Sequence, residues 1–196
     1  MTEIVQALAT LEADPTQADA LGRVAAQSKT AAQGSTEIQS AAKTAVADAF
    51  KRYRERGDAE QWIALCDAVL DSGLYTPAER AELLCDKGRV YADDLLRDKE
   101  AAEAFNAALK LQDDHEAAQD ALSQLEMVAG NWPKIVKKFV DEAKVSTDRQ
   151  LTTGLYTNIG EIYAKHSPAT NDAETHWYKA LAVEPRNRRA SQHLER

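Results

Sequence analysis

Matching residues recur along this chain at a fixed offset, and this recurrence constrains the fold more than any other feature. Each matched pair is of the same or similar type and is separated by 72 positions, as Gly88 and Gly160 are. The pairs are Gly88 with Gly160, Tyr91 with Tyr163, Ala101 with Ala173, Phe105 with Trp177, Ala108 with Ala180, and Leu109 with Leu181. Self-similarity at one offset is the signature of a repeat architecture, in which stacked units bury their apolar faces against their neighbours.

Composition favours helices for these units. Alanine, the best intrinsic helix former, accounts for 36 of the 196 residues, whereas aromatic residues make up only 6% of the chain. Hydrophobic residues make up 44%, which is enough to bury a core and too much for an intrinsically disordered chain. We therefore expect an all-α protein.

The charge balance argues against nucleic acid as a partner. The chain has 24 Lys and Arg residues against 32 Asp and Glu residues, which gives a net charge of −8 at pH 7. Binding of DNA or RNA depends on a field of basic side chains that displaces counterions from the phosphates. RNA binding by helical repeats is therefore the least favoured function.

The sequence also indicates where the protein works. Its first segment, MTEIVQALAT, has no Lys or Arg ahead of its apolar positions, unlike a signal peptide. No apolar run approaches the roughly 20 residues of a membrane span. We expect a soluble, cytoplasmic protein without membrane insertion.

Capping and turn patterns predict the helix boundaries. Thr76, Pro77 and Glu79 have the spacing of a capping box with proline at the first helical position, and residues 16–19 and 36–39 have similar spacing. Turns are expected at Gly57-Asp58, Gly130-Asn131 and residues 167–171. The predicted helices cover residues 2–12, 17–33, 36–56, 58–72, 77–96, 99–111, 114–129, 132–145, 148–166, 171–184 and 187–195.

The repeats resemble the tetratricopeptide repeat (TPR) superfamily, whose period of 34 residues is about half the observed offset. The best unit runs from about Leu155 to Asn187, and a second runs from about Leu84 to Asp113; both carry one extra residue after the tyrosine. The family pattern is carried by Ile159, Gly160, Tyr163, Ala173, Trp177, Ala180, Leu181 and Pro185 in the first and by Gly88, Tyr91, Ala101, Phe105 and Ala108 in the second. Weaker units surround residues 53–70 and 122–139.

The resemblance implies a right-handed α–α superhelix (solenoid) of about five TPR-like helical hairpins plus a C-terminal helix. In this reading residues 1–196 form a single repeat domain. The hairpins are expected at residues 1–35, 36–75, 76–113, 114–146 and 147–186, with residues 187–196 as a capping or truncated helix. The N-terminal register stays open, because residues 11–15 also look like a junction between repeats, with Pro15 in the place of Pro185.

No local motif in the chain predicts catalysis or metal binding. His115-Glu116 begins a zinc-helix pattern, but Gln119 stands where the second histidine is needed. Phosphate-binding, dinucleotide-binding and nucleophile-elbow motifs are missing from the sequence. Cys66 and Cys85 match no zinc or redox spacing and are expected to be small buried residues. We expect no enzymatic activity, metal or cofactor.

Because no catalytic or metal-binding motif is found, we expect the protein to act through a binding surface. In TPR arrays the first helix of each hairpin lines a concave groove, so the resemblance implies a non-catalytic scaffold or adaptor that binds a peptide or helix of a partner protein. The candidate groove residues are Lys51, Arg54, Arg89, Asp93, Asp120, Gln124, Met127, Thr157, Glu161 and Lys165, joined by Cys85. Their order predicts a groove that is basic toward its N-terminal end and mixed or acidic later.

Two other possibilities remain open. The chain could self-associate by stacking its end, after Leu194, on another copy, in which case the last helix should expose apolar residues. Alternatively, it could be the N-terminal fragment of a longer repeat protein. Trp62 and Trp132 are expected to be buried, although an exposed Trp132 would be a candidate binding anchor.

Overall fold

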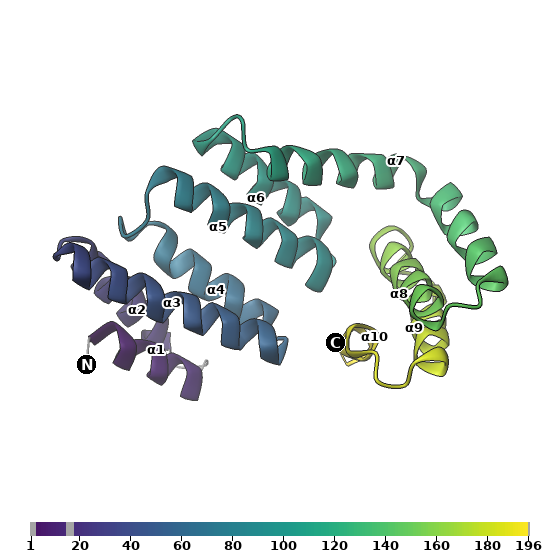
Figure 1. Cartoon of the computed structure of the whole chain (residues 1–196), viewed down its shortest axis with the longest axis horizontal. Helices are drawn as coiled ribbons and strands as arrows, with labels where there is room; N and C mark the ends of the chain where they lie inside the picture. Colours follow the sequence, from purple (N-terminus) through teal and green to yellow (C-terminus); the bar gives the residue numbers. More distant parts are fainter. Residues whose placement is uncertain (1–2, 15–17, 196) are drawn as a thin grey trace. The chain divides into compact units, whose positions relative to one another are not determined.

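The computed structural model describes residues 3–14 and 18–195, and these residues form helices and no strand, which confirms the all-α prediction (Figure 1). The helices are α1 (Glu3–Ala13), α2 (Ala18–Ala32), α3 (Thr36–Arg56), α4 (Ala59–Leu70), α5 (Pro77–Arg89), α6 (Asp98–Leu111), α7 (Glu116–Val145), α8 (Arg149–His166), α9 (Asp172–Val183) and α10 (Arg188–Leu194). A π-helical turn, η1 (Val90–Asp94), directly follows α5.

Most of the predicted boundaries are confirmed. Outside α7, each predicted helix matches an observed one, with ends that agree within about two residues when η1 is counted with α5. The helix start predicted at residue 36 is confirmed, but the cap expected from residues 36–39 is wrong, because Ser35 is the N-cap residue and Thr36 is already helical. The helix start predicted at Thr16 and the junction at Pro15 lie outside the described residues.

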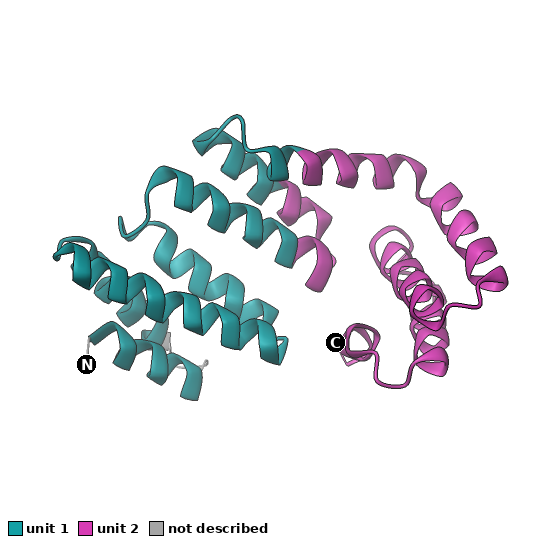
Figure 2. Ribbon diagram, in the orientation of Figure 1, with its two compact units in different colours: residues 1–90, 103–119 teal, residues 91–102, 120–196 magenta. Residues whose placement is uncertain are grey.

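The chain divides into two compact units (Figure 2). Unit 1 contains Met1–Val90 and Glu103–Gln119, and unit 2 contains Tyr91–Ala102 and Asp120–Arg196. Each unit therefore takes up two separate stretches of the sequence, and α6 and α7 both begin in one unit and continue in the other.

Unit 1 is built by helices that pack against near neighbours in sequence. α1 contacts α2 and α3, α2 contacts α3 and α4, and α4 contacts α3 and α5. α3 buries Val46, Phe50 and Tyr53, which share one helix face because they are spaced three or four residues apart. The ring of Phe50 lies 4.6 Å from that of Trp62 in α4, measured between centroids, so this pair joins the two helices.

Unit 2 has two apolar clusters that share α8. In the first, Val136 of α7 packs with Ile159 and Ile162 of α8. In the second, Trp177 of α9 packs with Ala190 of α10, and partly buried residues of α8 cover this cluster. α8 therefore carries the core of unit 2 on two sides.

Two glycines matched by the 72-residue offset have the same packing role. A Cβ added at Gly88 in α5 would lie 2.4 Å from the Phe105 ring of α6. A Cβ added at Gly160 in α8 would lie 2.4 Å from the Trp177 indole of α9. In each case a glycine lets a large aromatic residue lie directly against the backbone of the preceding helix, which is why the pairs recur together.

The turn predicted at Gly130-Asn131 is wrong, because residues 114–146 do not form a hairpin. α7 runs unbroken from Glu116 to Val145 and contains Pro133, and its ribbon bends part-way along (Figure 1). The proline lacks the N–H that would bond to the carbonyl four residues earlier, which is a standard cause of a bend. The helix continues because its apolar stripe passes through this region without interruption. That stripe comprises Val128, Trp132, Ile135, Val136, Phe139 and Val140.

Candidate functional site

Four of the expected groove residues lie in unit 1: Lys51, Arg54 and Arg89 are exposed, whereas Cys85 is buried. Arg54 of α3 and Arg89 of α5 converge on one carboxylate, that of Asp86. The Arg54 Nη2 atom lies 3.7 Å from Asp86 Oδ2, and the Arg89 Nη1 atom lies 3.1 Å from Asp86 Oδ1. The Lys51 Nζ atom lies 4.0 Å from Oε1 of Glu55, on the same helix. The structure therefore brings two of the predicted basic residues together, on neighbouring helices.

Asp86 was missing from the sequence prediction. It lies three residues before Arg89, a spacing that places two side chains on one helix face, and this was the signal that could have found it. The Arg54 guanidinium also lies over the Trp62 ring, 5.3 Å from its centroid. Trp62 itself is 2% exposed, as expected for a packing residue. The arginine is thus held by a carboxylate and an aromatic face at the same time.

The expected groove residues of unit 2 divide into exposed and buried ones. Asp93, Asp120, Gln124 and Met127 are exposed, whereas Thr157, Glu161 and the Lys165 ammonium are largely covered. Thr157 is buried rather than on an open surface, and its hydroxyl donates to the Thr153 carbonyl of its own helix at 2.9 Å. Cys85 in unit 1 is likewise fully buried.

Glu161 is covered by α10. Its carboxylate accepts hydrogen bonds from Arg189, with Arg189 Nε 2.5 Å from Oε1 and Nη2 2.8 Å from Oε2. His193 Nε2 lies 3.0 Å from Glu161 Oε1. Neither Arg189 nor His193 was predicted; they lie four residues apart on one helix, and that spacing was the available signal.

Lys165 is paired within unit 2 as well. Its Nζ atom lies 2.7 Å from Asp98 Oδ1, at the start of α6. The neighbouring His166 stacks on Trp132, with ring centroids 5.8 Å apart. Burial lowers the pKa of His166, against the opposing effect of Asp98. Trp132 is thus a packing residue between α7 and α8 rather than an exposed anchor.

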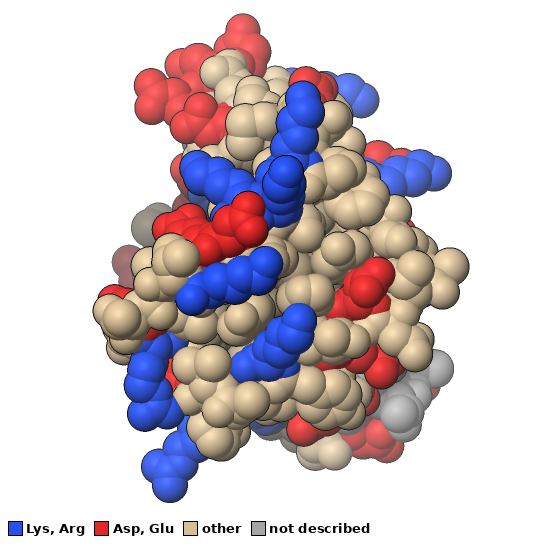
Figure 3. Space-filling model, turned by 90° about the vertical axis from the view of Figure 1, so that its right-hand side faces the viewer, with Lys and Arg blue, Asp and Glu red and all other residues tan. Residues whose placement is uncertain are grey.

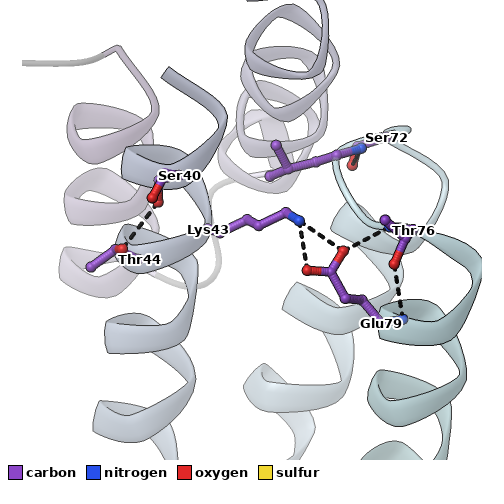
Figure 4. A network of polar contacts seen from close by, with 7 residues as sticks. Ser40, Lys43, Thr44, Ser72, Thr76 and Glu79 are labelled. Atoms are coloured by element: carbon purple, nitrogen blue, oxygen red, sulfur yellow. Dashed lines mark hydrogen bonds and ion pairs between the residues drawn. The ribbon is translucent and has the colours of Figure 1, made fainter. Parts of the chain in front are cut away.

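A polar network in unit 1 joins α3 to the start of α5 (Figure 4). Lys43 Nζ lies 2.6 and 2.7 Å from the two Glu79 carboxylate oxygens. Glu79 also accepts from the Thr76 backbone N–H at 2.8 Å, while its own N–H donates to the Thr76 hydroxyl, which confirms the predicted capping box. The hydrogen bonds from Lys43 and Thr76 hold the pKa of Glu79 below its usual range. The Lys43 and Glu79 side chains therefore serve the fold as a tie between helices.

Unit 1 also has two shallow grooves beside α3. One, of about 430 Å³, has a largely apolar lining that includes Ile4, Ala31, Ile38 and Ala42 of α1, α2 and α3. The other has a volume of about 680 Å³ and is lined mainly by α3. It is lined by Val5, Thr36, Glu37, Ser40, Ala41, Thr44, Ala45 and Asp48.

The two cysteine thiols of unit 1 are buried. Burial raises the pKa of the Cys66 thiol to about 12, and burial also raises the pKa of Cys85. Both cysteines are free and buried, as the sequence predicted. Over residues 3–14 and 18–195, no three His, Cys, Asp or Glu side chains are grouped in a way that could hold a metal ion.

The surface carries charges of both signs. On the face drawn in Figure 3, Lys and Arg side chains lie across the middle among uncharged and acidic ones. In the described part of the chain, no helix is both long and apolar enough to cross a membrane. The last helix does not show the exposed apolar residues expected of a self-stacking end, since Leu194 is half-buried.

Comparison of the chain with family models, with curated proteins and with solved structures gave no match.

Proposed function

We propose that this chain is a non-catalytic scaffold of TPR-like hairpins, wound as a right-handed superhelix, that binds a peptide or helix of another protein in a concave groove. The observation that carries the proposal is the convergence of Arg54 and Arg89, from α3 and α5, on Asp86 in unit 1. In unit 1, these are the two helices whose residues the TPR resemblance assigns to the groove.

The charge of this arrangement favours an acidic ligand. Two guanidinium groups share one carboxylate, so one positive charge stays uncompensated within the trio. The Arg54 and Arg89 side chains are 52% and 47% exposed, which leaves donor N–H groups open to solvent. Arginine presents planar, paired donors that fit a carboxylate, so an Asp or Glu side chain of a partner is the chemistry that this site recognises best.

The packing supports the repeat part of the proposal. Gly88 with Phe105, and Gly160 with Trp177, make the same helix-to-helix contact at positions related by the offset. A stack of such hairpins presents an extended surface rather than one deep pocket. Peptides and helices are the ligands that such a surface fits.

The test is affinity capture from the native lysate, followed by mass spectrometry, with wild-type protein and an Arg54→Glu/Arg89→Glu variant. The matched control is Lys29→Glu/Lys110→Glu, which changes the charge equally at two exposed positions of unit 1. A partner that is retained by the control and lost by the variant supports the proposal, provided that all three proteins unfold at the same temperature. Equal capture by all three proteins contradicts it.

A further inference from the structure

The side of α8 and α9 that faces α10 combines a buried carboxylate with an apolar surface. The Glu161 side chain is 10% exposed, and every bond that its carboxylate makes to Arg189 and His193 comes from α10. Taking a carboxylate out of water is costly unless charged donors replace the lost hydration. This side of unit 2 therefore requires a basic side chain opposite Glu161.

The geometry of the pair is specific for arginine. Arg189 uses two different nitrogens, Nε and Nη2, for the two carboxylate oxygens of Glu161. A lysine offers a single ammonium group and cannot reproduce this paired arrangement. His193 adds a third contact to Glu161 and stacks on Trp177, with ring centroids 5.0 Å apart and planes inclined by 19°.

The apolar part of the surface accepts small and branched side chains. Ala190 is fully buried, and Leu194 packs on the same cluster as Trp177 and Ala180. Together with Arg189 and His193, these residues occupy positions 1, 2, 5 and 6 of a six-residue segment. One face of a helix thus supplies all the contacts.

α10 has the properties of a bound ligand more than those of an independent element. It has seven residues, about half the length at which an isolated helix becomes even marginally stable in water. It follows α9 through residues 184–187, which include Pro185. Its helical form therefore depends on the surface that it covers.

We propose that the surface formed by Glu161, Trp177 and the apolar residues around them is a recognition site for an arginine-bearing helix, and that α10 is its resident occupant. A partner helix with Arg, Ala, His and Leu at positions 1, 2, 5 and 6 takes the place of α10. This site lies in unit 2 and does not depend on the arginine site of unit 1, so the inference goes beyond the proposed function.

The test uses full-length protein and one probe, a fluorescein-labelled synthetic peptide of residues 186–195. Arg189→Glu in the protein breaks the contact that holds α10 and should let the probe bind. Wild-type protein should bind the probe about tenfold more weakly, because its own α10 competes at a high effective concentration. Arg186→Glu is the matched control, since it makes the same charge change at an exposed position before α10 and should behave like wild type.

Two further measurements make the result decisive. A probe carrying Arg189→Glu should not bind, and the protein Glu161→Gln/Arg189→Glu should not bind the unmodified probe. Circular dichroism checks that Arg189→Glu remains folded. If this variant unfolds, or binds the probe no better than wild type does, α10 is an integral part of unit 2 and the proposal is overturned. Because no partner from the lysate is involved, this outcome is independent of the arginine-site experiment.

Discussion

At glycine positions, the absence of a side chain determines how closely another residue can pack. Gly160 has no room for a Cβ, because the Trp177 indole occupies that space, whereas a Cβ on Gly154 in the same helix would meet no heavy atom within 4 Å. The two glycines of α8 therefore have opposite roles. One is required by packing, and the other only lowers the helix propensity.

We expect Gly160→Ala to destabilise the protein by about 1 to 3 kcal/mol through overpacking. Gly154→Ala should stabilise it by about 0.4 to 1 kcal/mol, because alanine removes conformational freedom from the unfolded chain. Urea unfolding of both variants measures the difference. A neutral Gly160→Ala would mean that α8 and α9 do not approach each other as described.

Histidine titration should make unit 2 sensitive to acid. His176 is 8% exposed, its Nδ1 lies 2.7 Å from the Asp172 carbonyl, and its ring stacks on Tyr163 with centroids 5.4 Å apart. Burial lowers the pKa of His176 below its ordinary value of 6.5. The unfolded chain therefore takes up a proton at a higher pH than the folded protein does.

The stabilising contribution of neutral His176 should accordingly be fully present above pH 6.5. The free energy of unfolding should then decline as the pH falls through that value toward the lower pKa of the folded state. Urea unfolding between pH 7.5 and 5 measures this decline. His176→Phe keeps a ring in place but cannot titrate, so it should reduce the pH dependence. An identical pH profile in wild type and variant would assign the acid sensitivity to other groups.

At the scale of the element, the helix ends differ in how they are held. Thr76 caps α5 with a complete capping box, whereas Ser35 at the start of α3 makes no side-chain capping bond. The Thr76 hydroxyl thus bonds to the backbone of its helix, whereas the Ser35 hydroxyl does not.

Thr76→Ala should cost about 0.5 to 2 kcal/mol, the usual range for a lost N-cap. Ser35→Ala should cost clearly less, because no capping bond is removed. Thermal unfolding of the two variants, made in parallel, measures both values. Equal losses would show that the hydrogen bonds of Thr76 do not stabilise the helix.

Local signals in the sequence predicted the elements well where they agreed with packing. Thr76, Pro77 and Glu79 marked the start of α5 correctly because the motif satisfies backbone donors within one turn. Gly130 and Asn131 were misleading for the opposite reason. Their preference for a turn is local, whereas the apolar stripe that keeps α7 helical packs on Ile159 and Ile162, some 25 residues further along the chain.

The candidate sites were predictable only in part. The TPR resemblance implied that Arg54 and Arg89 lie on open helix faces, and both side chains are exposed. The burial of Glu161 could not be predicted, because it depends on α10 folding back onto α8. Residue spacing within one helix contains no information on which distant helix will cover it.

At the scale of the whole molecule, each unit needs residues that are distant in sequence. Phe105, which packs on Gly88 in unit 1, lies beyond a stretch that belongs to unit 2. A fragment that ends at residue 90 keeps helices α1 to α5 and lacks the aromatic ring that covers α5 at Gly88.

We expect the fragment of residues 1–90 to unfold at a lower temperature than the fragment of residues 1–119, which contains both stretches of unit 1. The physical reason is the exposure of the α5 face around Gly88 when Phe105 is absent. Circular dichroism melts of the two fragments measure this difference. Equal melting temperatures would show that the segment 103–119 adds nothing to the stability of unit 1.

The interleaving of the two units also has a consequence for synthesis. Chains grow from the N-terminus, so residues 91–102 leave the ribosome before unit 1 has received its second stretch, 103–119. These twelve residues must wait, without the rest of unit 2, until α8, α9 and α10 have been translated. During that interval the nascent chain carries both stretches of unit 1, with residues 91–102 between them and without the rest of unit 2.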